Sequence, residues 1–411
     1  MRSDGPRVIA VTSKIPDMRT DASSAVSSPR YESLDLWRGA ACFLVLLNHS
    51  VWYQPVAGPS TALELINSVT AAIASRLWMG VPIFFVISGY CITATAISHS
   101  RGGKPVGQYF YKRVRRIFPP YWIVLFAYAL LLGAVDLLLG GALTRAGDLL
   151  RPWWHSTWQW IGSVTLTEMW RWHIVGGQKA LVLGHAWTLC YEEQFYAVTG
   201  ALLLVGPNRY FRWATAVTIL VAAVALVGTT RGWPLEGYFF DGSWLLFAMG
   251  ILLFFVLNRP YRNGRLLAAA GMVATIALAA SLGPADLLKS EKTTAQSFLV
   301  GAAFTLAALV LHRWDGQIAD HPRLNGLRTC GLMCYSLYLV HLPVTRFVRA
   351  ALELGGVDTA HLSPLLSIPP CVLISLWLSW RFHLLVERRF MSIRERPARS
   401  QVLVEAVTPS A

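Results

Sequence analysis

The chain has 411 residues, of which 55% are apolar and only 14% are charged, against about 25% charged residues in ordinary soluble domains. This composition excludes a disordered chain, argues against a water-soluble globule and provides enough apolar residues for ten membrane spans of about 20 residues each. The formal net charge of +14 is compatible with anionic lipid, nucleic acid or an anionic substrate, so the positions of the cations must distinguish these partners.

The composition predicts an all-α, polytopic membrane protein. Residues 1–33 are polar and Ser-rich, and the first apolar run begins near Leu34, too late for a typical cleaved signal peptide. We expect a disordered cytoplasmic tail over 1–33, a transmembrane domain over 34–386 and a basic cytoplasmic tail over 387–411. Within the domain, hydropathy predicts ten transmembrane helices. They cover residues 36–56, 77–97, 119–140, 186–206, 213–230, 238–257, 266–283, 296–311, 330–350 and 364–385.

The first predicted span carries two ionisable residues, Arg38 and His49. Ionisable side chains inside a membrane are costly, so they are functional candidates by default. Eleven residues of helix place His49 about 16 Å further along the axis than Arg38. A neutral imidazole can take a proton from a hydroxyl, as a general base must. The alternative is a histidine that only packs between helices, and hydropathy alone does not choose between the two.

Basic residues precede the third span, where aromatic residues flank the run that contains Lys112, Arg113, Arg115 and Arg116. Such cations can simply extend to lipid phosphates at the cytoplasmic boundary. However, Arg113 and Arg116 are three residues apart on one helix face, and two guanidinium groups can bind phosphate oxygens bidentately. An anionic cytoplasmic cosubstrate such as a nucleotide or coenzyme A would suit this pair.

The segment 141–185 is either an eleventh span or an interfacial segment, and charge favours the second interpretation. With ten spans and a cytoplasmic N-terminus, 26 of the 36 Lys and Arg residues lie on the inner side. An eleventh span would move the Arg-rich C-terminus outside, against the positive-inside bias. The segment is also rich in Trp, which favours the headgroup level. We therefore expect an interfacial or re-entrant outer segment, both termini in the cytoplasm, and no nucleic-acid partner.

Two later spans carry further polar residues. Glu192 and Glu193 are adjacent in the fourth span and point about 100° apart on a helix, so only one is expected to face the bundle interior. Their alternative role is that of a hydrogen-bonded structural carboxyl group. In the ninth span, Tyr338 and His341 share a polar stripe, for which packing and substrate contact are equally good explanations.

Other common kinds of site are not predicted. The six cysteines all lie in apolar stretches and none forms a CxxC pair, which argues against a disulfide framework or a structural zinc site. Histidines with HExxH spacing, a P-loop, a GxSxG elbow and an HxxxxD acyltransferase box are absent from the sequence. We expect no metal.

Taken together, these runs resemble the membrane-bound acyltransferase 3 family, the O-acyltransferases that modify surface polysaccharides, lipopolysaccharide, peptidoglycan and macrolides. The resemblance extends from the first predicted span to the last. The matching segments are residues 34–40 with His49, Gly80 with 84–90, 113–121, 187–196, 335–341 and 386–388.

The resemblance implies transfer of an acyl group, often acetyl, from acyl-coenzyme A to a hydroxyl of a sugar, glycan, glycolipid or glycosylated metabolite at a bacterial inner membrane. By position, the resemblance makes His49 the catalytic base and Arg38 its partner in the motif. Glu192 would be the carboxyl group of the family's fourth-span motif. Arg113 and Arg116 would bind the donor phosphates. Four further residues are weaker candidates for substrate contact: Ser88, Tyr335, Tyr338 and His341.

Two other classes of protein stay open at this point. A secondary transporter or a flippase of lipid-linked or anionic substrates would also have ten spans and intramembrane charges. Such proteins often contain two matching halves, and no internal repeat is visible here, although Pro82 and Pro343 interrupt two spans. A membrane sensor with a basic inner face would leave His49 and Glu192 unexplained.

Overall fold

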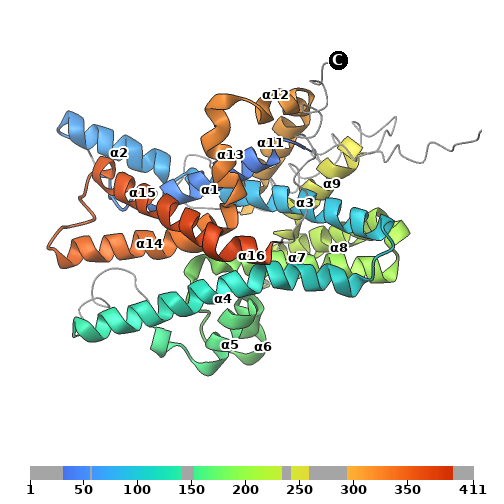
Figure 1. The fold of residues 1–411 in the computed structure, drawn as a ribbon, viewed down its shortest axis with the longest axis horizontal. Helices are drawn as coiled ribbons and strands as arrows, with labels where there is room; N and C mark the ends of the chain where they lie inside the picture. Colours follow the sequence, from blue (N-terminus) through green and yellow to red (C-terminus); the bar gives the residue numbers. More distant parts are fainter. Residues whose placement is uncertain (1–30, 56–57, 141–151, 234–241, 259–293, 392–411) are drawn as a thin grey trace, which may run out of the picture. The chain divides into compact units, whose positions relative to one another are not determined.

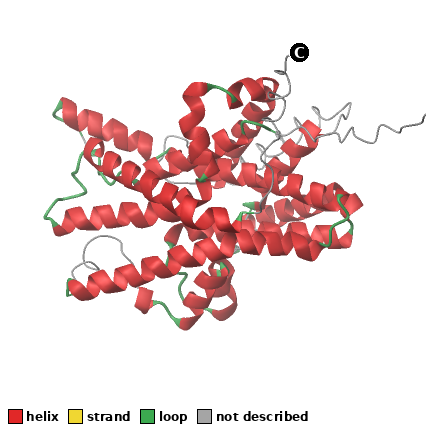
Figure 2. Cartoon of the chain, in the orientation of Figure 1, coloured by secondary structure: helices red, strands yellow, loops and turns green. Residues whose placement is uncertain are grey.

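The structure, a computed structural model, describes residues 31–55, 58–140, 152–233, 242–258 and 294–391. Within these ranges all regular elements are helices and no strand occurs (Figure 2). The longer helices, labelled in Figure 1, are α1 (Leu34–His49), α2 (Ala62–Ala74), α3 (Gly80–Arg101), α4 (Val106–Leu138), α7 (Trp187–Val205), α8 (Tyr210–Arg231), α9 (Trp244–Asn258), α11 (Thr294–Leu311), α14 (Cys334–Leu354) and α15 (Pro364–Phe382). The shorter ones are α5 (Thr157–Thr165), α6 (Glu168–Val175), α12 (Asp315–Ala319), α13 (Asn325–Leu332) and α16 (Arg388–Phe390).

The prediction of an all-helical membrane protein is confirmed for the described residues. Five helical stretches are long and apolar enough to cross a membrane, and the apolar α9 is shorter. These stretches are Ala62–Arg101, Val106–Leu138, Pro207–Gly228, Thr294–Ala319 and Pro364–Phe390. The expected span at 266–283 and most of both expected tails lie outside the described residues, and the number of ten spans stays a prediction.

Several element boundaries differ from those expected. The first span was predicted over 36–56, but α1 ends at His49, because hydropathy counts the apolar residues that follow whether or not they are helical. The third was predicted from 119, but α4 already begins at Val106. Lys and Arg are good helix formers, so the basic run continues the helix although it is too polar for a membrane core. With 33 residues, α4 is about 50 Å long and exceeds the ~30 Å hydrocarbon thickness.

The described part of the segment 141–185 contains no helix that could cross a membrane. α5 has 9 residues and α6 has 8, so each is only about 12–14 Å long. A fully buried carboxylate fixes this segment: Arg171 Nε and Nη2 donate to the two oxygens of Glu168 at 2.6 and 2.8 Å, and the backbone N–H of Ala180 adds a third bond of 2.9 Å. The hydrogen bonds to Glu168 raise the pKa of Arg171, so the guanidinium group keeps its proton.

The helices around α1 alternate in direction. α14 runs parallel to α1, because Cys42 Sγ lies 3.7 Å from the carbonyl oxygen of Cys334 and the rings of His49 and His341 lie 5.3 Å apart. α15 runs antiparallel to both: Ser367 Oγ donates to the carbonyl of Ser50 at 2.8 Å at one end of the bundle. At the other end, α15 continues into the π-helical turn His383–Glu387. The start of α1 and the end of α15 therefore lie at the same end of the bundle.

Glycines allow the helices to approach one another closely. A Cβ on Gly89 of α3 would lie 2.2 Å from the carbonyl oxygen of Phe247 in α9, and one on Gly250 would lie 2.1 Å from the carbonyl oxygen of Val86. Small residues at such crossings let two backbones touch, which is how membrane helices gain van der Waals contact. Any larger residue at either position would push α3 and α9 apart.

The N-terminus of α1 is attached to a buried carboxylate of α12. Asp315 accepts hydrogen bonds from Ser33 Oγ at 2.6 Å, from Ser33 N–H at 3.0 Å and from the N–H of Glu32. The hydroxyl of Tyr31 donates to the carbonyl of Ala308 at 2.9 Å. Tyr31 and Ser33, which belong to the expected tail, thus pack into the helix bundle, and these bonds fix where α1 starts relative to α11 and α12.

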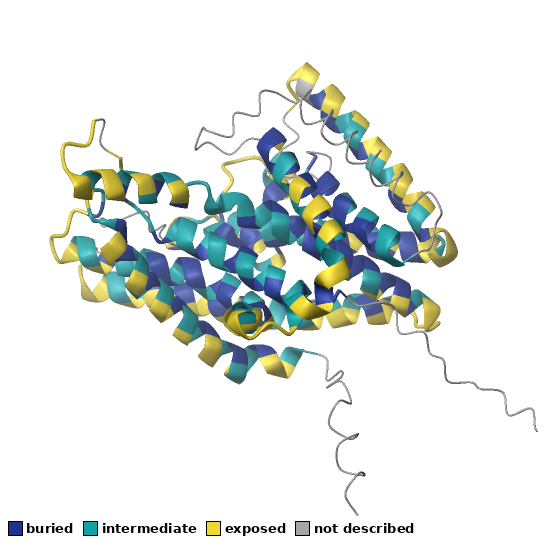
Figure 3. Cartoon of the chain, turned by 90° about the horizontal axis from the view of Figure 1, so that it is seen from above, coloured by how far each residue is buried: buried dark blue, intermediate teal, exposed yellow. Residues whose placement is uncertain are grey.

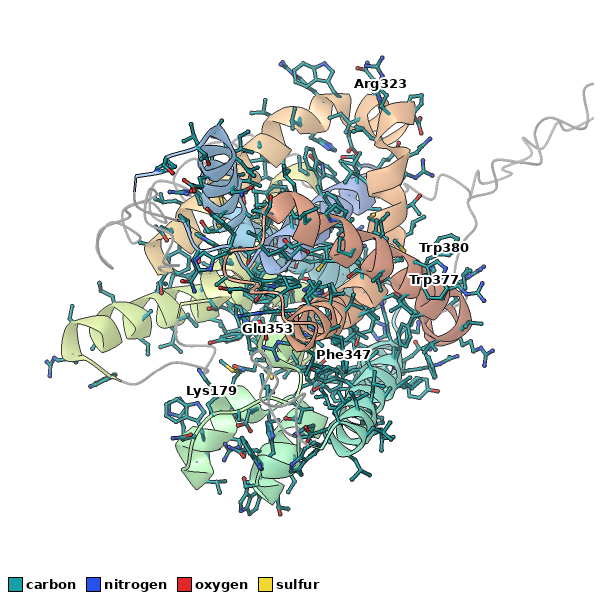
Figure 4. All side chains as sticks on the ribbon, turned by 90° about the vertical axis from the view of Figure 1, so that its left-hand side faces the viewer. Lys179, Arg323, Phe347, Glu353, Trp377 and Trp380 are labelled. Atoms are coloured by element: carbon teal, nitrogen blue, oxygen red, sulfur yellow. The ribbon has the colours of Figure 1, made fainter. Side chains whose placement is uncertain are left out.

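The outer faces of the helices are apolar. Figure 3 shows buried residues on the sides of the helices that face one another and exposed residues on the opposite sides. Among the exposed side chains are Leu130, Leu204 and Trp377, with exposed fractions of 74%, 68% and 63%. Trp377 and Trp380 project outward from α15 (Figure 4). Exposed apolar faces of this extent suit contact with lipid rather than water.

Candidate functional site

A cavity of about 440 Å³ lies among α1, α3, α4, α7 and α14. All nine residues that the sequence singled out as site candidates line it. They are Arg38, His49, Ser88, Arg113, Arg116, Glu192, Tyr335, Tyr338 and His341. Helices that are distant in the sequence thus bring these side chains to one place.

The cavity has two ends. Arg38 lies near the start of α1, and we call this end of the cavity the Arg38 end. Arg113 and Arg116 also line the cavity. α1 and α14 are parallel, so later residues of both helices lie toward the opposite end. His49 and His341 come later along these two helices. Arg346 lies five residues beyond His341 and also lines the cavity; we call this the Arg346 end.

His49 has the tautomer that a general base needs. Its Nδ1 lies 2.8 Å from the carbonyl oxygen of Val45, and because a carbonyl can only accept, Nδ1 carries the proton. In the neutral ring Nε2 then has the free lone pair. Nδ1 of His341 is likewise 2.7 Å from the carbonyl oxygen of Tyr338, so both histidines present Nε2 as an acceptor.

Glu192 belongs to a hydrogen-bond network between α3, α4 and α7. Its Oε1 accepts from Ser88 Oγ at 3.0 Å and from the Tyr196 hydroxyl at 2.8 Å. The guanidinium group of Arg113 lies 4.8 Å from the centre of the Tyr196 ring. Glu193 does not line the cavity, in keeping with the angle expected between the two carboxyl groups.

The three cations toward the Arg38 end differ in their partners. Arg38 donates to Asp35 Oδ1 at 3.0 Å and to Cys91 Sγ at 2.9 Å, which holds it against α3. Arg113 contacts Tyr196, whereas Arg116 adds a third guanidinium group to the cavity wall. Together with Arg346, four arginines and a single carboxylate line the cavity. With neutral histidines, the formal charge of the cavity lining is therefore +3. Such a cavity favours anionic occupants.

The two tyrosines of α14 use their hydroxyl protons within the protein. Tyr335 donates to the carbonyl of Ile117 at 2.7 Å, and Tyr338 donates to the carbonyl of His185 at 2.7 Å. Thr188 Oγ1 in turn donates to the Tyr338 hydroxyl at 2.9 Å. These bonds fix α14 against α4 and α7, and in this arrangement the two protons are not available to a substrate.

Among the cavity residues that were not predicted from the sequence are His185, Tyr196 and Arg346. Arg346 carried a usable signal, because it is a further cation within the ninth predicted span. His185 and Tyr196 flank the Glu192 motif, but nothing local distinguishes a cavity residue from a packed one. Their role depends on contacts with α4 and α14.

A second polar cluster fixes the end of α15 outside the cavity lining. Glu387 Oε2 accepts from Ser336 Oγ at 2.5 Å and lies 2.8 Å from His383 Nδ1. All three side chains are buried. The π-helical turn brings His383 and Glu387 together, and the bond to Ser336 then attaches this turn to α14.

Among the residues that the structure describes, no group of three or more His, Cys, Asp or Glu side chains is placed to hold a metal ion. All six cysteines are described, and each is a free thiol. The polar groups that line the cavity include arginines, histidines, hydroxyls, the amide of Asn48 and one carboxylate.

Comparison with known proteins identifies the family. Residues 31–384 match the acyltransferase domain of the acyltransferase 3 family. The chain is also similar to Nodulation protein 10 of Rhizobium leguminosarum bv. viciae, with 25% identity over 344 residues, covering 78% of this chain and 85% of the relative. No solved structure matches the chain. Because the family model matches most of the chain, this protein belongs to the acyltransferase 3 family and is an acyltransferase.

Proposed function

We propose that this acyltransferase moves an acyl group, in the simplest case acetyl, from acyl-coenzyme A to a hydroxyl of a sugar, glycan, glycolipid or glycosylated metabolite. The observation that carries the proposal is the presence of His49, with its Nε2 lone pair free, in the same cavity as Arg113 and Arg116. A base for a hydroxyl and a phosphate-binding pair for the donor are then parts of one site.

The donor would enter at the Arg38 end. Arg113 and Arg116 would bind its phosphates, because guanidinium forks match phosphate oxygens in geometry and charge. The pantetheine arm would then extend along the cavity and bring the thioester to His49. Arg38, held by Asp35 and Cys91, would add positive charge along this path.

The chemical step would use His49 as general base. Its Nε2 takes the proton from the acceptor hydroxyl while that oxygen attacks the thioester carbonyl carbon. When the tetrahedral intermediate collapses, the carbon–sulfur bond breaks, and the thiolate takes up the proton from the imidazolium. Glu192 is bonded to Ser88 and Tyr196 rather than to His49, so it would stabilise the imidazolium through its charge.

We further propose ten transmembrane helices in a bacterial inner membrane, with the Arg38 end and both termini on the cytoplasmic side. The helix directions support this arrangement, since α1 begins and α15 ends at the same end of the bundle. α9 and α11 run parallel, because Phe298 lies beside Gly242 and Gly301 lies beside Leu246. Each crossing of the membrane reverses the chain direction. One further span between α9 and α11, as predicted at 266–283, would therefore make these two helices parallel.

The proposal can be tested with the purified full-length chain and labelled acetyl-coenzyme A. We expect release of free thiol together with transfer of label to hydroxylated glycans, detected by mass spectrometry. A transporter or flippase would move substrate without liberating thiol. Label transfer from a donor other than a coenzyme A thioester, with none from acetyl-coenzyme A or longer acyl-coenzyme A, would contradict the proposed donor.

A further inference from the structure

The Arg346 end of the cavity contains polar groups that the proposed reaction does not use. His185 is 7% exposed and His341 is 2% exposed, and both line the cavity. Neither nitrogen of His185 nor Nε2 of His341 has a hydrogen-bond partner of good geometry among the described residues. Buried polar atoms are almost always hydrogen-bonded, because leaving them unpaired costs free energy. Two residues with such atoms line one cavity, which indicates a place for a polar ligand.

These histidines form a continuous row of rings. The ring centres of His49 and His341 are 5.3 Å apart, and those of His341 and His185 are 5.2 Å apart. A ligand bound beside His185 and His341 would therefore also lie beside His49. In the proposed reaction, this is where the acceptor hydroxyl must be placed.

A cation completes this end of the cavity. Arg346 lies next to Gly184, where an added Cβ would be 3.3 Å from its Nη2, so the missing side chain leaves room for the guanidinium group. The carboxylate of the cavity, Glu192, is already bonded to Ser88 and Tyr196. The next arginine along α14 is different, because Arg349 Nε donates to Glu353 at 2.8 Å. Figure 4 shows the bundle from this side, with Phe347 and Glu353 of α14 labelled.

We propose that the Arg346 end binds an acceptor that carries an anionic group, a carboxylate or a phosphate, and that Arg346 holds this group while the histidines orient the hydroxyl beside His49. This inference rests on the proposed function. A guanidinium fork binds carboxylate and phosphate bidentately, and buried polar groups discriminate strongly against a ligand that leaves them unpaired. The substrate class is thus an acidic sugar, a phosphorylated sugar or a lipid-linked sugar phosphate.

The test compares three acceptors with acetyl-coenzyme A as donor: neutral methyl glucoside, methyl glucuronide with its carboxylate, and glucose 6-phosphate. For the wild-type chain we expect kcat/KM to be about 10- to 100-fold higher for at least one anionic acceptor than for the neutral one, the range typical of a charged hydrogen bond. The carboxylate and phosphate arms distinguish the two sources of the anion. Free thiol and acetylated product are both measured.

The Arg346→Gln variant should lower the ratio of anionic to neutral kcat/KM to near unity, and Arg346→Lys should restore part of it. Arg349→Gln is the matched control, because it removes a cation from the same helix outside the cavity lining, and it should keep the wild-type ratio. A wild-type ratio near unity, or an equal loss with all acceptors in Arg346→Gln, would overturn the inference. In either case thiol release would still support the proposed function.

Binding can be measured without catalysis. Methyl glucuronide or glucose 6-phosphate should raise the thermal unfolding midpoint of the wild-type chain more than methyl glucoside does, because a ligand stabilises the state that it binds. This difference should vanish in Arg346→Gln and persist in Arg349→Gln. Equal shifts with neutral and anionic sugars would reject the inference even if no acceptor tested is acylated, whereas absence of thiol release from every donor would reject the proposed function alone.

Discussion

The two ends of the cavity differ in how their polar groups are partnered. At the Arg38 end, the side chains of Arg38 and Glu192 each take part in two hydrogen bonds within the protein. At the Arg346 end, both nitrogens of His185 and Nε2 of His341 make none with the described residues. Pre-formed networks hold side chains in place before a ligand arrives, and unpaired groups obtain their partners from the ligand.

This difference matches the two substrates of the proposed reaction. A donor built on coenzyme A always offers the same phosphates, so a pre-organised basic end can serve every acyl chain. The acceptor determines which product is made, and the groups left unpaired at the Arg346 end would recognise it. Four variants test this comparison of the two ends.

The largest effect is expected from the loss of the proposed base. His49→Ala should lower kcat by about 10²- to 10⁴-fold, the usual contribution of a general base, and change the KM for the donor little. Thiol release at saturating acetyl-coenzyme A measures this loss. His361→Ala is the control, since this exposed histidine pairs with Asp358 on the surface. Full acyl transfer by a normally inserted His49→Ala chain would exclude the base role.

At the Arg38 end, the double variant Arg113→Gln/Arg116→Gln should raise the KM for acetyl-coenzyme A about 10- to 100-fold, because charged hydrogen bonds to phosphate are lost. The preference among acceptors should not change. The matched control is Lys112→Gln/Arg115→Gln, which removes the same charge from the same turns of α4 but not from the cavity lining. Equal coenzyme A affinity in both double variants would refute the phosphate site.

The attachment of α15 at the Arg38 end should matter for stability. Ser336→Ala removes a donor from Glu387, which is 2% exposed, and should lower the free energy of unfolding by about 1–3 kcal/mol. Glu387 keeps its bond to His383, so the helix turn should remain formed. Unfolding of the solubilised protein, followed by circular dichroism, measures the change. No loss of stability would show that the cluster is dispensable.

The corresponding contact at the Arg346 end should have the smallest effect. Ser367→Ala removes a single neutral hydrogen bond to the carbonyl of Ser50, which is worth about 0.5–1.5 kcal/mol. The same unfolding experiment ranks the two variants. A larger loss for Ser367→Ala than for Ser336→Ala would reverse the comparison of the two ends.

Much of the site could be predicted from the sequence because ionisable residues are conspicuous in apolar spans. Arg38, His49 and Glu192 each interrupt a hydrophobic run, and the i, i+3 spacing of Arg113 and Arg116 predicts a shared face. Arg346 interrupts an apolar span in the same way, but its proximity to Gly184 depends on how α14 lies against the start of α7. No local pattern encodes that contact.

Element boundaries were less predictable for a related reason. Hydropathy measures transfer into lipid, whereas a helix continues wherever backbone hydrogen bonds and propensity allow. This is why α4 includes the basic run and Pro119, and why the predicted first span extends beyond the end of α1 at His49.

The sequence by itself determined the class of protein, the approximate positions of most of its described helices and the ionisable residues available for chemistry. These depend on composition and on the high cost of placing charge in hydrocarbon, both of which can be judged from a short stretch of chain. Only the tertiary structure decided that these residues share one cavity, that His49 and His341 present Nε2, and that His185 and Arg346 complete the opposite end. The shared cavity and the positions of His185 and Arg346 depend on contacts between helices, and the two tautomers depend on which backbone carbonyl each imidazole ring meets.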